Sequence, residues 1–158
     1  MQHGSTIVLR GVVISIGLIV LGLCLFGLPR AISTEMSLGA DFDYGPIFLG
    51  LYVPALPFFL ALYQALNLLD NIDKNKAFSA ASVRALKNIK YCAFAISGMF
   101  AAGMPYVFYV ADRDDAPGVA LIGFIIIGAS FVIATFAAVL QKLIQNAVEI
   151  KSENDLTV

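Results

Sequence analysis

Four uncharged, apolar stretches constrain this chain more than any other feature of its sequence. They span residues 11–28, 47–69, 91–111 and 119–140. Each is close to the roughly 20 residues that a helix needs to cross the ~30 Å hydrocarbon core of a bilayer. The chain is also 59% hydrophobic and only 13% charged, whereas soluble domains are about 25% charged. We therefore expect an all-α integral membrane protein, a four-helix bundle that forms a single transmembrane domain over residues 1–158.

The first stretch has a competing interpretation as a cleaved signal peptide, because Arg10 precedes it. However, no small-x-small cleavage pattern follows it before Pro29 and Arg30. A lipoprotein signal is also disfavoured, since Leu23 stands before Cys24 where a small residue is needed. We therefore expect the first helix to be retained as a span.

Positive charge is concentrated in the connector between the second and third stretches. Residues 70–90 hold five of the ten basic residues, which are Lys74, Lys76, Arg84, Lys87 and Lys90. Short loops rich in Lys and Arg stay on the cytoplasmic side of a membrane. The connector and both termini are thus expected in the cytoplasm, and the chain is expected to be a multi-pass protein of the cell membrane.

The two remaining loops are acidic. Residues 29–46 and 112–118 together carry six acidic and two basic residues. We expect both loops to lie outside the cell, since they are poor in Lys and Arg. The acidic outer face that they form is predicted to contain Asp41, Asp43, Asp112, Asp114 and Asp115.

The connector contains a signal for the start of a helix. Ser79 is a favoured N-cap residue, and Phe78 and Val83 match the two positions of a hydrophobic staple. An apolar stripe at helical spacing continues through Leu86 and Ile89. The pattern predicts a short amphipathic helix that starts at the membrane surface and runs into the third span, with its cations directed toward lipid headgroups or a partner.

The same stretch carries a family resemblance, through Leu68, Leu69, Ile72, Phe78, Ser79, Val83, Leu86 and Ile89. In this spacing the residues resemble the signature loop of the domain of unknown function 2975 family, a group of uncharacterised bacterial four-helix membrane proteins. Ala77 departs from the pattern, because the family often has Pro before Phe. Members frequently sit beside genes for small helix-turn-helix regulators. The resemblance therefore implies a membrane partner for a cytoplasmic DNA-binding protein.

The four spans contain no Asp, Glu, Lys, Arg or His. Ion-coupled transporters and intramembrane proteases place such side chains within their spans. The two cysteines, Cys24 and Cys92, are isolated, and no spacing predicts a metal or phosphate site. We therefore expect no catalytic residue, no metal, no cofactor and no enzyme activity.

Two hypotheses of function remain. The favoured one is a small membrane sensor or tether that contacts lipid and binds a cytoplasmic protein, such as a helix-turn-helix regulator, without touching nucleic acid itself. Its candidate partner-binding residues are Lys74, Lys76, Phe78, Ser79, Arg84, Lys87 and Lys90. The alternative is an envelope immunity or resistance protein whose acidic outer face binds a cationic peptide or ion. A homo-oligomer formed through Gly and Ser faces stays open. Within the bundle, the small-residue stripe Ala93, Ser97 and Ala101 of the third span is expected to meet the stripe Ser130, Ala134 and Ala138 of the fourth.

A labelling experiment tests the predicted topology. A cysteine introduced at Asn75 should react with a membrane-impermeant thiol reagent only from the cytoplasm, and one introduced at Asp114 only from outside. The reason is the excess of Lys and Arg in the connector. The opposite labelling pattern would overturn the orientation.

Overall fold

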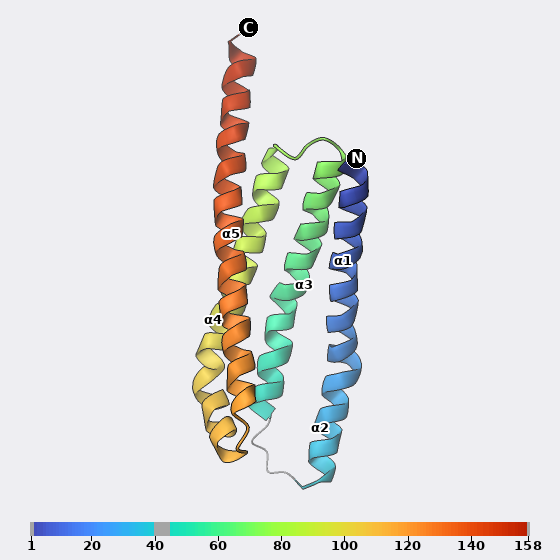
Figure 1. Ribbon diagram of the computed structural model, residues 1–158, viewed down its shortest axis with the longest axis vertical. Helices are drawn as coiled ribbons and strands as arrows, with labels where there is room; N and C mark the ends of the chain where they lie inside the picture. The colour runs from blue at the N-terminus through green and yellow to red at the C-terminus, as the bar shows by residue number, and fades with distance from the viewer. Residues whose placement is uncertain (1, 40–44, 158) are drawn as a thin grey trace.

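The computed structural model describes residues 2–39 and 45–157, and the regular structure in these residues is helical throughout. Four helical rods stand side by side and run up and down between two ends (Figure 1). One end holds the start of the first rod and the turn 74–79, and we call it the connector end; the opposite end is the distal end. Four helices are long and apolar enough to cross a membrane. The predicted all-α, four-span fold is thus confirmed, and the chain is a membrane protein in contact with lipid.

The first rod is continuous and has three segments, α1 (Gln2–Gly22), the π-helical turn η1 (Leu23–Gly27) and α2 (Leu28–Ser37). The sequence predicts a span of 11–28 between a polar tail and a loop, and the helix continues beyond this span at both ends, through the tail and into the loop. Hydropathy marks where a helix leaves hydrocarbon, whereas the helix itself continues until its backbone conformation breaks. Here the break comes at Gly39, which has a left-handed φ of 68°.

Pro29 accounts for the π-helical turn that precedes it. Proline has no N–H, so a carbonyl in the preceding turn loses its donor. In η1 the Leu28 N–H donates to the Leu23 carbonyl, five residues back, and on that spacing the Cys24 carbonyl would need the N–H that Pro29 lacks. The hydroxyl of Tyr52, on α3 (Gly45–Asp73), donates instead, with its oxygen 2.8 Å from the Cys24 carbonyl oxygen. This hydrogen bond joins the first rod to the second.

The remaining rods are α4 (Ala80–Arg113) and α5 (Pro117–Leu156). The amphipathic connector helix predicted from the sequence is the first part of α4, which runs on into the third span without a break. At 1.5 Å per residue the 40 residues of α5 reach roughly 60 Å, about twice the hydrocarbon thickness. Residues 141–156, which we call the C-terminal extension, therefore lie beyond the last apolar span, and the end of this extension projects beyond the connector end (Figure 1).

Two left-handed residues close the turns at either end of α4. Asn75 has a φ of 58° and Asp115 a φ of 50°. After α3, the Lys76 N–H donates to the Asn71 carbonyl at 2.8 Å, and the Asn75 N–H donates to the Ile72 carbonyl at 3.1 Å. This pair of bonds is a Schellman motif, with Asn in place of the usual Gly. The short turn allows α3 and α4 to pack as antiparallel neighbours.

Small residues bring α4 and α5 into the most extensive contact of the bundle. Ala134 is fully buried, and a Cβ added to Gly123 would lie 2.8 Å from the Met104 sulfur. The Ser97 hydroxyl donates to the Ile127 carbonyl at 3.3 Å across the same interface. Ala101, which the sequence places on the α4 contact stripe, is exposed, and Met104 is buried instead. Small side chains at the interface let the two helix backbones approach closely, which is a common basis of helix packing in membranes.

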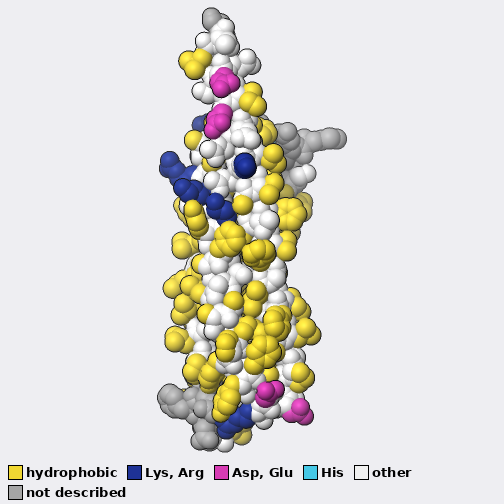
Figure 2. All heavy atoms as spheres, turned by 90° about the vertical axis from the view of Figure 1, so that its left-hand side faces the viewer, with side chains coloured by type: hydrophobic (Ala, Val, Ile, Leu, Met, Phe, Trp, Pro, Cys, Tyr) yellow, Lys and Arg dark blue, Asp and Glu magenta, His cyan; other side chains and the backbone are white. Residues whose placement is uncertain are grey.

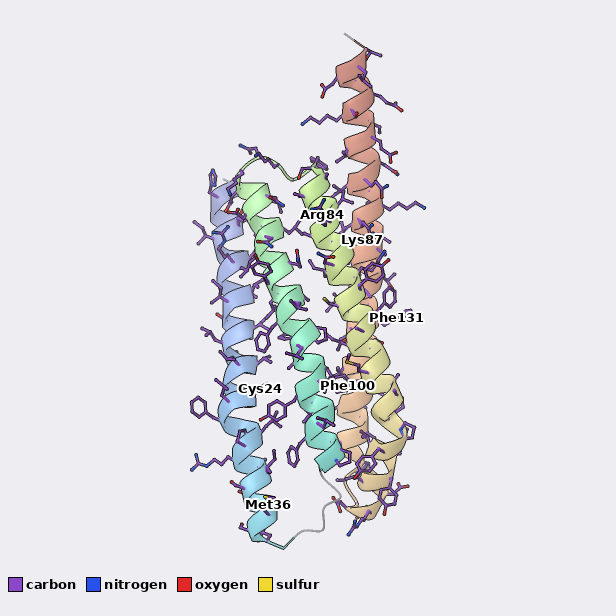
Figure 3. The ribbon with its side chains drawn as sticks, turned by 180° about the vertical axis from the view of Figure 1, so that it is seen from behind. Cys24, Met36, Arg84, Lys87, Phe100 and Phe131 are labelled. Atoms are coloured by element: carbon purple, nitrogen blue, oxygen red, sulfur yellow. The ribbon has the colours of Figure 1, made fainter. Side chains whose placement is uncertain are left out.

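The first rod packs far less extensively, and mainly on α3. Thr6 is the buried side chain among those that the structure describes in α1. In Figure 3 the first rod stands at one side of the bundle, with α4 and α5 on the other side of α3. The bundle is therefore compact around α3, α4 and α5 and open along α1.

Tyr52→Phe tests the interhelical bond. We expect it to lower the free energy of unfolding in detergent by about 0.5–1.5 kcal/mol, because the Cys24 carbonyl loses its side-chain donor. Tyr63→Phe on the same helix is the matched control, since the Tyr63 side chain is 60% exposed. Equal midpoints of thermal unfolding for the two variants would show that the bond does not stabilise the fold.

Candidate functional site

The structure divides the seven predicted partner-binding residues among three settings toward the connector end. One lysine belongs to a cluster of ion pairs between α1 and α3. Three residues of the turn line a hollow beside α1. The last three cations lie along the first turns of α4. The seven residues therefore occupy three different settings, and each setting is described separately below.

The start of α4 is held by two serines. Ser79 has an extended backbone, and its hydroxyl accepts the Ser82 N–H at 3.4 Å, which confirms the predicted N-cap. The Ser82 side chain is fully buried, and its hydroxyl donates to the Lys76 carbonyl at 3.2 Å. In a full capping box a Glu or Gln at this position bonds back to the cap. Here Ser82 ties the helix to the connector turn instead.

Phe78 stands at the surface beside a hollow. Its side chain is 61% exposed, so its predicted staple with Val83 stays a prediction. The hollow has a volume of about 680 Å³ and is enclosed by α1, the end of α3, the turn and one residue of α5, Lys151. Lys76 and Ser79 line it as well. One basic residue of the connector, Lys76, and one of the C-terminal extension, Lys151, thus line the same hollow.

The cations of α4 lie on a different face. Arg84 and Lys87 are both exposed (Figure 3), while the Lys90 ammonium lies 4.8 Å from the centre of the Tyr91 ring. Lys and Arg side chains gather below the projecting end of α5, with hydrophobic side chains covering the bundle beneath them (Figure 2). Such a basic band at the edge of an apolar belt is suited to anionic lipid headgroups or to an acidic partner.

A polar hollow of about 320 Å³ lies beside Arg84, between α3 and α4. Four carboxamides line it, Gln64, Asn67, Asn71 and Asn88, and each is half-buried. The amides at 64 and 67 are typical of residues that bond neighbouring helices together. Within the described part of the chain they do not form such bonds but border this hollow.

An ion-pair cluster that the sequence analysis does not predict joins α1 to α3. The Arg10 guanidinium lies 3.2 Å from Asp73 and 3.7 Å from Asp70, and His3 Nδ1 lies 3.6 Å from Asp73. A hydrogen bond from the Lys74 ammonium at 2.7 Å lowers the pKa of Asp70, which lies just beyond the apolar span. Arg10 directly precedes the first apolar stretch and Asp70 directly follows the second, so antiparallel packing of these two spans brings the charges to one level. This placement was the sequence signal that could have predicted the cluster.

The predicted acidic outer face lies at the distal end. Asp112, Asp114 and Asp115 are exposed around the α4–α5 turn. Asp41 and Asp43 lie outside the described residues. Among residues 2–39 and 45–157, no three His, Cys, Asp or Glu side chains come close enough together to hold a metal ion. The prediction that the acidic face binds a peptide or an ion is not tested by this arrangement.

Asp73→Asn tests the ion-pair cluster. We expect amide hydrogen exchange in the first two turns of α1 to become about two- to five-fold faster, because a partly exposed ion pair contributes roughly 0.2–1 kcal/mol. Asp155→Asn is the matched control, because Asp155 is exposed on the C-terminal extension and far from α1. Equal exchange in both variants would mean that the cluster does not hold α1.

Comparison with known proteins places the chain in a family. The family described as "Protein of unknown function (DUF2975)" matches residues 31–158, which include α3, α4 and α5. A relative from Bacillus subtilis (strain 168), "Uncharacterized membrane protein YoaS", is 55% identical over 160 residues, and the match covers the full length of both chains. No solved structure matches the chain. The resemblance seen in the connector motif is confirmed, and the chain belongs to the DUF2975 family of membrane proteins.

Proposed function

We propose that this protein is a small, non-enzymatic tether or sensor that binds a cytoplasmic protein at the cell membrane. The partner class that the family resemblance implies is a helix-turn-helix regulator. The connector end is the surface for this contact, and in this proposal it faces the cytoplasm because it carries most of the Lys and Arg. The spans contain no ionisable side chain, which supports a binding role over a catalytic one.

The C-terminal extension is the observation that carries the proposal. It is helical throughout 141–156 and stands roughly 24 Å beyond the last apolar span. Leu143 and Ile150 lie two turns apart on one face, and their side chains are 59% and 65% exposed. Apolar side chains on a helix in water are typical of a surface that a partner covers.

The charges beside the extension favour a partner with acidic groups. The exposed cations Arg84 and Lys87 lie on α4, next to α5. A partner helix that covered Leu143 and Ile150 would bring acidic side chains beside its own apolar face within reach of Arg84 and Lys87. Electrostatic complementarity of this kind raises the rate of association and fixes the register of a complex.

Leu143→Glu combined with Ile150→Glu tests the contact. We expect recovery of the co-purifying regulator by the tagged protein in detergent to fall at least tenfold, because burying one such side chain contributes about 1.5–3 kcal/mol. Gln145→Glu combined with Ser152→Glu is the matched control, since it adds the same charge to exposed positions of the extension. Equal recovery with both double variants, each correctly inserted, would exclude the extension as the contact surface.

The exchange of Arg84→Lys with Lys87→Arg separates a protein contact from simple lipid attraction. The exchange conserves charge but changes the geometry of the hydrogen-bond donors. This change should weaken a specific protein contact and leave attraction to a membrane surface unchanged. We expect recovery of the regulator to fall several-fold. Unchanged recovery would leave these two cations as anchors for anionic lipid.

A further inference from the structure

A long apolar groove runs along the open side of the bundle. It has a volume of about 780 Å³ and lies between η1, α3, α4 and α5. Its walls include Leu23 of η1, Phe58 of α3, Ile96 of α4 and Ile133 of α5. The groove exists because α1 packs mainly on α3 and leaves the space between itself and α5 unfilled. Its volume falls within the roughly 300–1,000 Å³ that is usual for ligand sites.

The basic hollow at the connector end lies on the same face of α3 as this groove. Ala55, Phe58, Leu62 and Ala65 line the groove, and Leu69 and Ile72 line the hollow. The spacing of three or four residues keeps all six positions on one side of the helix. The apolar groove and the basic hollow are therefore arranged in line, with the groove inside the membrane and the hollow at its edge.

The hollow carries two cations without an acidic partner. Lys76 and Lys151 are exposed, and neither forms an ion pair within residues 2–39 and 45–157. The nearby Asp73 is already engaged by Arg10. The polar residues Ser5 and Thr6 of α1 line the opposite wall. An anionic group placed here would meet two ammonium groups just beyond the apolar spans, on the side where lipid headgroups border them.

We propose that the groove and the hollow together form a binding site for one anionic phospholipid. One acyl chain lies in the groove, and the phosphate lies between Lys76 and Lys151. The groove covers 15 residues of α3, from Leu51 to Ala65, or roughly 21 Å, which exceeds the ~15 Å of one hydrocarbon leaflet. The choice of an anionic lipid over a second copy of the chain rests on the two unpaired lysines.

A single tryptophan reports on occupancy, because the chain has none of its own. Phe58→Trp places the reporter in the groove, and Ile133→Trp provides a second reporter on the opposite wall should the first variant misfold. Phe136→Trp is the control, because its side chain is 66% exposed on α5 and does not line the groove. Each variant is reconstituted in vesicles that hold equal amounts of phosphatidylglycerol and phosphatidylcholine, with bromine on the acyl chains of one lipid at a time.

We expect the groove reporters to be quenched by brominated phosphatidylglycerol with an apparent affinity several-fold higher than by brominated phosphatidylcholine. Lys76→Gln with Lys151→Gln should remove this preference, since each cation near the membrane surface contributes about fivefold. Arg30→Gln with Arg113→Gln removes the same charge at the distal end and should leave it in place. The reporter at position 136 should show little preference throughout.

Four results would overturn the proposal. Equal quenching of the groove reporters by both lipids would mean that the groove holds only bulk lipid. Absence of quenching by either lipid would mean that the groove is closed. A disulfide-linked dimer formed through a cysteine introduced at residue 133 would identify a second copy of the chain as the occupant of the groove. A preference that survives loss of both lysines would place the headgroup elsewhere. None of these results depends on the cytoplasmic partner, so the lipid site and the tether can fail separately.

Discussion

The absence of water in the bilayer core is the constraint on which the rest of this structure depends. Every backbone N–H and carbonyl within the hydrocarbon must find a partner inside the protein, which favours helices of at least membrane length. The one place where a proline disturbs the first rod shows how strictly this holds. Pro29 lacks the N–H that the Cys24 carbonyl would need in the π-helical turn, and the Tyr52 hydroxyl donates in its place. A local defect in one helix is thereby repaired by a bond to its neighbour.

Packing in this setting depends on side-chain size more than on hydrophobicity, because lipid tails are as apolar as the helices. Ala134, Ala137 and Gly123 let α4 and α5 approach closely. The first rod offers a wall of exposed, larger apolar residues and packs mainly on α3. The open groove follows directly from this difference. A protein that closed the groove would need small residues on α1 facing α5.

Charge is excluded from the spans and is therefore concentrated at the ends of the bundle, where it is arranged in different ways. Some of these charges form ion pairs with one another, namely Arg10 and Lys74 with Asp70 and Asp73, at the connector ends of α1 and α3. The cations that remain without acidic partners in the described residues are the ones available for lipid or protein. Both proposals rest on these unpaired cations, but they use different ones. The proposed lipid site uses Lys76 and Lys151. The proposed tether uses Arg84 and Lys87, together with the apolar face of the C-terminal extension.

The sequence by itself determined the class of the protein, the four spans, the N-cap at Ser79 and the family. Each of these depends on local composition or on spacing within one helix. The sequence could not predict that the first helix continues through the polar segments on either side of its span. Hydropathy reports the depth of a residue in the membrane and not the conformation of its backbone. Only the tertiary structure decided that Ala101 is exposed, that Arg10 meets Asp73, and that Arg84 and Lys76 lie on different faces. These outcomes depend on the rotation of each helix about its axis. That rotation is set by contacts between rods. The residues of a single span are apolar on all sides, so their hydrophobic pattern does not predict it.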